Sequence, residues 1–135
     1  MRRIIGIGAL ALTITACLGS DFSDSLEGSW QLTSGTVDGA DVPILENHAI
    51  TIDFEGDQVS GVAACNSFSG SFTRDGTSIE FGNIAMTEMA CIDPPEAMEA
   101  EAAFVAGLLA VDTVNIDDGL TLSGAGVELV FEPAG

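Results

Sequence analysis

Apolar and polar residues alternate along several short stretches of the chain, which is the pattern of half-buried β-strands. In the segment AITIDF, Ile50, Ile52 and Phe54 fall on one side and the residues between them are polar. Asp38-Gly39 and Asp75-Gly76 favour hairpin turns. Strands are expected at 29–37, 49–54, 58–64, around Phe68 and Phe72, and at 78–81, 113–116, 120–122 and 127–131. So many short strands predict a mainly β domain, either a sandwich or a barrel.

One segment departs from this alternation and has the period of a helix. The helix is expected from Pro94 to about Val111, with Asp93 as its N-cap and Pro94 in its first turn. Phe104, Leu108 and Val111 then share one apolar face. Glu99 and Glu101 are expected to point away from that face. The helix therefore packs on the sheet or closes one end of a barrel.

The N-terminus has the pattern of a targeting signal. Two arginines precede the apolar run Ile4–Ile14, which is too short to span a bilayer. The small residue Ala16 then stands before Cys17, as in the signals of bacterial lipoproteins. A plain secretory signal cleaved near Ala16 is the alternative. The expected division is a lipoprotein signal peptide at 1–16, a lipidated Cys17 with a polar tether at 17–25, and one domain at 26–135.

The chain is strongly acidic. Its 135 residues include 21 Asp and Glu, three Arg and no Lys, for a net charge of -18, and loss of the two signal-peptide arginines brings this to -20. Such a surface repels phosphates, which excludes nucleic acid as a partner. Acyl chains on Cys17 would still anchor the protein to a membrane. The acidity fits either a saline habitat or a site for divalent cations.

The cysteines favour a disulfide. Besides Cys17 the chain has Cys65 and Cys91, and disulfides persist outside the cytoplasm. Two buried free thiols are the alternative. His48 is the only histidine and the two cysteines do not form a C-x-x-C motif, so neither a zinc site nor a redox site is predicted. No catalytic residue, metal ligand or cofactor site is marked by residue type and spacing.

Several ordered motifs resemble those of a known family. The opening LEGSWQL, the stretch GVAACNSFSGSF and the segment TEMAC are similar to signatures of the META domain, the HslJ-like bacterial family. Met98, Glu101, Phe104 and Leu108 match the helix that follows these signatures. The motif residues to which the resemblance gives a structural role are Gly28, Trp30, Gly61, Asn66, Gly70, Thr87 and Met89.

The resemblance implies a compact antiparallel β-barrel with one helix, in a protein of the cell envelope. Asn66 is expected to set a bend beside a Cys65–Cys91 bridge, and glycines at 61 and 70 to allow close backbone approach or bulges. Two residues depart from the family pattern. Ala64 stands where glycine is usual, and Phe72 stands where an aromatic residue with a hydroxyl is common.

The function expected from these observations is not enzymatic. The chain is interpreted as a lipoprotein, anchored through Cys17 to the outer membrane or to the outer face of the cell membrane. It would support envelope integrity or stress tolerance by binding a partner. The alternative is a barrel that carries or senses a small molecule or a divalent cation. An interior lined wholly by apolar side chains would argue against this alternative: Trp30, Ile50, Ile52, Phe54, Phe68, Phe104 and Val130.

Overall fold

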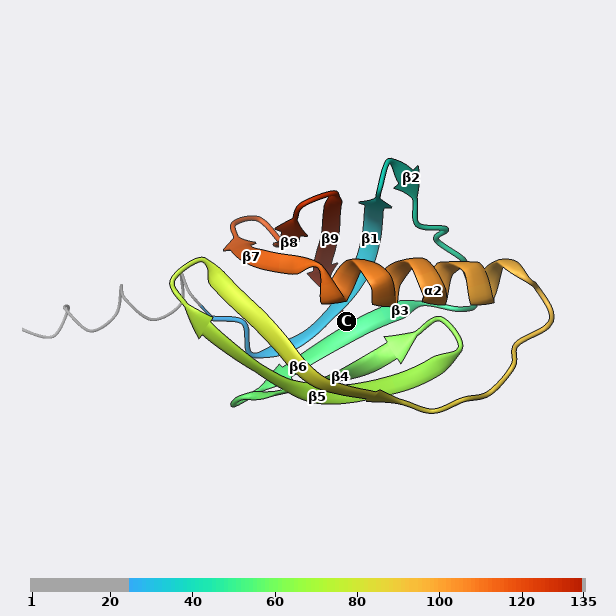
Figure 1. The fold of residues 1–135 in the computed structure, drawn as a ribbon, viewed down its shortest axis with the longest axis horizontal. Coiled ribbons are helices and arrows are strands. Elements are labelled where there is room, and N and C mark those ends of the chain that lie inside the picture. The colour runs from blue at the N-terminus through green and yellow to red at the C-terminus, as the bar shows by residue number, and fades with distance from the viewer. Residues whose placement is uncertain (1–24, 135) are drawn as a thin grey trace, which may run out of the picture.

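A computed structural model describes residues 25–134, which form nine strands and one helix. Figure 1 shows a strongly curved sheet with the helix lying across its open side. The elements are β1 (Gly28–Val37), β2 (Ala40–Asp41), β3 (Ile50–Glu55), β4 (Gln58–Ala63), β5 (Asn66–Asp75), β6 (Ser78–Met86), α2 (Glu96–Leu109), β7 (Val111–Ile116), β8 (Leu120–Gly124) and β9 (Val127–Pro133). Cys17 and most of the expected tether lie outside the described residues.

The sheet closes into an antiparallel barrel of eight strands, which confirms the predicted fold class. Each strand pairs with the next in the order β1-β3-β4-β5-β6-β7-β8-β9, and β1 also pairs with β9. The short β2 pairs only with the end of β1, after the turn at Asp38-Gly39. Asp38 and Gly39 both have positive φ, as the two central residues of a type I′ hairpin turn require.

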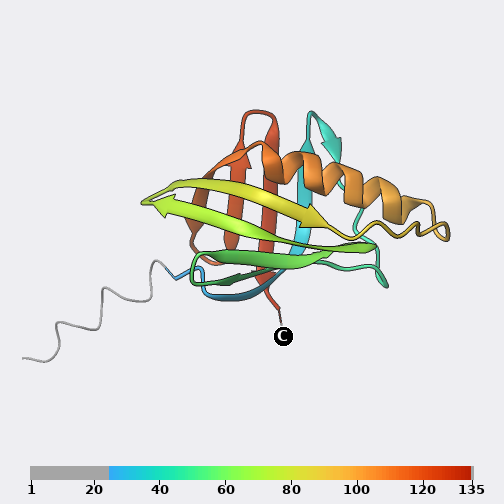
Figure 2. The same ribbon diagram turned by 60° about the horizontal axis from the view of Figure 1, so that its bottom comes forward.

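The barrel is weakest between β6 and β7. A single pair, Ser78 with Thr113, joins these two strands, whereas β5 and β6 pair along most of their length. The helix α2 lies between them in the chain and crosses the open side of the barrel, where it contacts β1, β4 and β9 (Figure 2). Its Phe104 and Leu108 are buried in the common core, as the predicted apolar face requires.

The barrel interior is filled with apolar side chains. Ile52, Phe54 and Phe68 contribute from one side of the sheet, and rings such as Phe104 and Phe131 meet at 6.4 Å between centroids. The placement of Val130 in this interior was wrong. In β9 the buried residues are Val127, Leu129 and Phe131, so the alternation of side chains leaves Val130 half-buried outside the core.

The helix boundaries also differ from the prediction. The N-cap is Pro95 and no side chain caps the helix, so Asp93 does not have the predicted role. The prediction that Glu101 points away from the apolar face of the helix was also wrong. Glu101 is buried, because it follows Ala97 by four residues and precedes Phe104 by three on the face turned to the barrel. None of the helices in residues 25–134 is long and apolar enough to cross a membrane.

Candidate functional site

The stretch GVAACNSFSGSF forms the β4–β5 hairpin, whose turn is very tight. Ala63 pairs with Asn66, so only Ala64 and Cys65 make the loop. Ala64 has φ of 74°, in the left-handed region where type II′ hairpin turns take glycine. The bend expected at Asn66 is therefore made by Ala64, and Asn66 begins β5 with its side chain buried.

The side-chain amide of Asn66 connects three segments of the chain. Its Oδ1 accepts hydrogen bonds from the backbone N–H of Met89 at 2.6 Å and from the Thr87 hydroxyl at 2.8 Å. Its Nδ2 donates to the Met89 carbonyl at 3.1 Å and to Glu101 Oε2 at 2.8 Å. Asn66 is only 2% exposed, and these four bonds use every donor and acceptor of its amide.

The carboxylate of Glu101 completes this polar cluster from the helix. Its Oε1 accepts the backbone N–H of Asn66 at 2.6 Å and that of Cys65 at 3.3 Å. Glu101 is 8% exposed, so the carboxylate is largely removed from water. A buried carboxylate is tolerated when donors surround it, and here the hairpin turn supplies them. We call Asn66, Thr87, Met89 and Glu101 the Asn66 cluster.

A disulfide lies beside the Asn66 cluster. Cys65 and Cys91 are bonded, with their Cα atoms 6.0 Å apart, which confirms the predicted pair. Thr87 extends the β5–β6 ladder by donating its backbone N–H to the Ser67 carbonyl at 3.1 Å. The segment from Thr87 to Cys91 is therefore held at both ends and in the middle, although it has no regular secondary structure.

The remaining motif residues have structural roles. A Cβ atom at Gly61 would overlap the Thr51 carbonyl oxygen and lie 2.9 Å from the Phe68 ring. At Gly70 it would lie 2.6 Å from Ile84, at the point where the β5–β6 register shifts. The expected close approach and bulge are thus confirmed. Gly28 has a positive φ of 119°, and Trp30 is buried with its indole N–H donating to the Leu26 carbonyl at 3.0 Å.

An open cleft of about 590 Å³ lies away from the Asn66 cluster, beside the weak β6–β7 contact. Its walls combine β5, β6, the end of α2 and the start of β7. The lining residues are Thr73, Arg74, Asp75, Ser78, Ile79, Glu80, Phe81, Leu109, Ala110, Val111 and Asp112. Across residues 25–134, no three His, Cys, Asp or Glu side chains gather closely enough to hold a metal ion.

Comparison with known proteins decides the family. The META domain family model matches residues 20–135, which is most of the chain.

The chain belongs to the META domain family.

Solved structures share the fold of this META domain. An NMR structure of a protein from Burkholderia xenovorans is 21% identical, with 99% of each chain covered and a TM-score of 0.69. A crystal structure of a DUF4847 family protein from Bacteroides vulgatus is 13% identical, covers 80% of this chain and 93% of its own, and has a TM-score of 0.61. A search of curated proteins found no match.

The META signatures, distant in sequence, meet in one place. Asn66 comes from the stretch around the first cysteine, Thr87 and Met89 from the TEMAC segment, and Glu101 from the helix. The hydroxyl-bearing aromatic that the family commonly has is replaced here by Phe72, whose ring packs edge-on against Phe54 with centroids 5.1 Å apart. The sequence did contain one indication that Glu101 is buried in the cluster, because the helical period places this carboxylate on the face turned to the core.

Proposed function

We propose that this META domain protein is a non-catalytic, lipid-anchored protein of the cell envelope that supports envelope integrity or stress tolerance by binding a protein partner. The observation that carries the proposal is the closed Asn66 cluster. Its two buried side chains, Asn66 and Glu101, bond to each other, to the Thr87 hydroxyl and to the backbone, so their polar groups are committed to holding the fold. A partner would therefore be recognised by the outer surface.

The filled interior supports binding on the surface. Of the seven side chains that were expected to line the barrel, six are buried in the core and only Val130 is not, and Leu129 and Phe131 take its place. Barrels that carry a ligand need an interior that side chains leave open. Here the rings of Phe54, Phe68 and Phe104 occupy that space.

The signal sequence supports the membrane anchor. Cys17 follows a basic start, an apolar run and a small residue, in the order of a lipoprotein signal. Seven residues, and so eight residue-to-residue steps, separate Cys17 from Ser25, where the described chain begins. An extended segment of this length reaches about 26 Å. Acyl chains on Cys17 would therefore hold the barrel close to the membrane but free to contact other proteins.

A Cys17→Ala substitution tests the anchor. The full-length variant, expressed in a bacterial host, is expected to leave the membrane fraction, because it has no acylation site. The matched control is the double variant Cys65→Ala/Cys91→Ala, which loses the other two cysteines and should stay with the membrane. Fractionation with labelled palmitate measures both. A Cys17→Ala protein that remained in the membrane fraction would contradict the proposal.

The open cleft favours a second candidate, a carrier or sensor of a small cationic or apolar ligand. The apolar side chains of Phe81 and Leu109 line it beside the carboxylates of Asp75, Glu80 and Asp112. Ligands that bind the folded state raise the unfolding midpoint. Thermal unfolding with calcium chloride and with sodium chloride at matched ionic strength tests the cation. A midpoint that follows ionic strength alone would count against a calcium site.

A further inference from the structure

The segment between β6 and α2, residues 87–95, has no regular structure, but it is held to the barrel at Thr87, Met89 and Cys91. Met89 is held through both its backbone polar groups, because its N–H donates to Asn66 Oδ1 and its carbonyl accepts from Asn66 Nδ2. The amide of Asn66 thus pairs with Met89 as a neighbouring strand would. Two residues further on, Cys91 is bonded to Cys65. We call residues 87–95 the tethered loop.

The tethered loop presents two large apolar side chains to solvent. Met89 is 58% exposed and Ile92 is 80% exposed. A scattered apolar residue on a surface needs no explanation. These two residues differ because they lie three positions apart, on a segment that part-buried hydrogen bonds at Met89 and a disulfide at Cys91 hold in place. A partner that covered them would lose little loop entropy, and pre-organisation of this kind raises affinity.

The surroundings of these two side chains are acidic. Exposed carboxylates flank them in sequence at Glu88 and Asp93, and the first turn of α2 adds Glu96 and Glu99. The one Lys or Arg in residues 25–134 is Arg74, near the β5–β6 turn at the other end of the barrel (Figure 1). An apolar centre with an acidic rim is complementary to an apolar side chain flanked by cationic ones.

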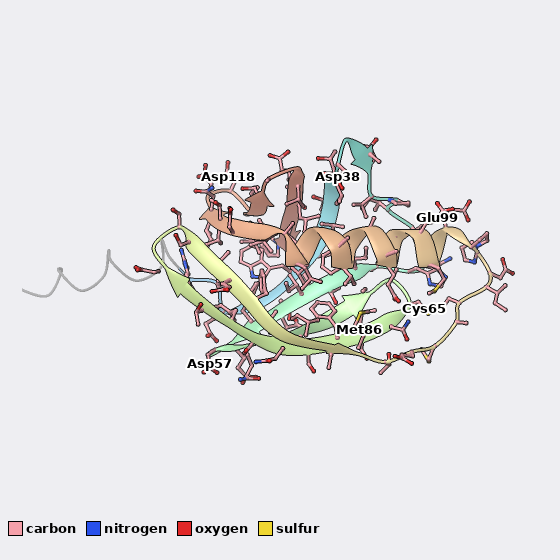
Figure 3. All side chains as sticks on the ribbon, viewed as in Figure 1. Asp38, Asp57, Cys65, Met86, Glu99 and Asp118 are labelled. Atoms are coloured by element: carbon pink, nitrogen blue, oxygen red, sulfur yellow. A yellow bond between two sulfur atoms is a disulfide. The ribbon has the colours of Figure 1, made fainter. Side chains whose placement is uncertain are left out.

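We propose that the tethered loop is the docking surface for a protein partner that presents an apolar side chain flanked by Lys or Arg. This inference rests on the proposed function and names its binding surface. In both views the described chain starts at one end of the barrel and the tethered loop lies at the opposite end. Figure 3 places Cys65 and Glu99 at the loop end, and Asp57 and Asp118 at the other. A lipid anchor before Ser25 would therefore leave the loop accessible to a partner.

The test measures binding of a basic, apolar probe by the full-length lipidated protein in phosphatidylcholine nanodiscs. The probe is a short fluorescein-labelled peptide in which Lys and Leu alternate, and its polarisation reports binding. The variant Met89→Ser/Ile92→Ser removes the apolar centre. The matched control Ile44→Ser/Val62→Ser removes two other exposed apolar side chains and leaves the loop unchanged. Empty nanodiscs give the lipid background.

We expect Met89→Ser/Ile92→Ser to weaken peptide binding at least tenfold, as loss of a central apolar anchor does at interfaces, and the control pair to weaken it less than about twofold. Raising sodium chloride from about 0.05 M to about 0.5 M should weaken binding to the wild type, because it screens the acidic rim. Equal binding by both variants would overturn the proposal, since diffuse attraction to an acidic surface would then explain it. Absence of binding to the wild type, or binding insensitive to salt, would overturn it as well.

The same proteins separate this inference from the proposed function. Fractionation of cells that express Met89→Ser/Ile92→Ser should show the variant in the membrane fraction, because Cys17 is unchanged. A wild type found outside the membrane fraction, with peptide binding that still depends on Met89 and Ile92, would contradict the anchor and leave the docking surface standing. A wild type found in the membrane fraction, with peptide binding that does not depend on Met89 and Ile92, would contradict the docking surface and leave the anchor standing.

Discussion

Removal of the Glu101 carboxylate should destabilise the whole barrel. In Glu101→Ala the backbone N–H of Asn66 and one N–H of its amide lose their acceptors, at 2.6 and 2.8 Å in the wild type. Cys65 keeps the Ala63 carbonyl at 2.9 Å, so its N–H is not left unpaired. Each buried donor without a partner costs about 1–3 kcal/mol. For two such donors we expect a loss of about 2–6 kcal/mol, against roughly 5–15 kcal/mol for a typical domain.

The amide variant at the same position makes the test sharper. In Glu101→Gln the new oxygen can accept the two backbone N–H groups, but the new NH₂ must face the NH₂ of Asn66. Asn66 cannot turn its amide over, because its oxygen already binds Met89 and Thr87. Glu101→Gln should therefore cost about 1–3 kcal/mol, from a single mismatched donor.

Urea unfolding followed by the fluorescence of Trp30, the only tryptophan, measures these free energies. The matched control is Glu99→Ala, which removes an exposed carboxylate of the same helix two residues away. It should change the free energy of unfolding by less than about 0.5 kcal/mol. A Glu101→Ala protein within about 1 kcal/mol of the wild type would refute the structural importance assigned to the Asn66 cluster.

Three other changes have definite expected outcomes in the same unfolding assay. Ala64→Gly should raise the free energy of unfolding by about 0.5–1 kcal/mol, because it relieves a left-handed alanine, and a loss would contradict this. Gly61→Ala should cost at least about 2 kcal/mol through overlap with the strand beside it, whereas Gly82→Ala, with its nearest atom 4.0 Å away, should cost less than about 1 kcal/mol. Reduction of the disulfide, whose cysteines lie 26 positions apart, should cost about 3.5 kcal/mol, and unfolding curves that coincide with and without dithiothreitol would rule this out.

The barrel was predictable where one local signal was enough. Ile50, Ile52 and Phe54 are all buried, as their spacing requires, and the turn at Asp38-Gly39 is where it was predicted. The turn predicted at Asp75-Gly76 lies one residue later, at Gly76-Thr77, because Asp75 pairs with Ser78. The ends of strands were harder to predict from the sequence where contacts with distant segments set them. β6 runs to Met86 instead of ending near Phe81, because β5 pairs with it as far as Phe68. Strand propensity within 82–86 is too weak to indicate this extension.

The disulfide was predictable because only two cysteines remained after Cys17, whereas the Asn66 cluster was not. The position of Glu101 on the helix indicated burial, but its charge indicated exposure, and polarity is ordinarily the better guide. Only the donors of the β4–β5 turn reverse that expectation. The β4–β5 turn at Ala64 was also not predicted. An alanine in a stretch of alternating residues predicts a continued strand, and the left-handed backbone appears only in the folded hairpin.

The Asn66 cluster also explains how a barrel with one poorly paired seam stays closed. β6 and β7 share a single residue pair, so α2 must be held across the gap for Phe104 and Leu108 to fill the core. Glu101 attaches the first half of α2 to the β4–β5 turn, and the end of α2 leads directly into β7. The tethered loop is the connection from β6 to that helix, so the contacts that close the barrel also fix the backbone of the loop. Substitutions of Asn66 or Glu101 should consequently lower stability and peptide binding together, while those of the Met89 and Ile92 side chains should lower binding alone.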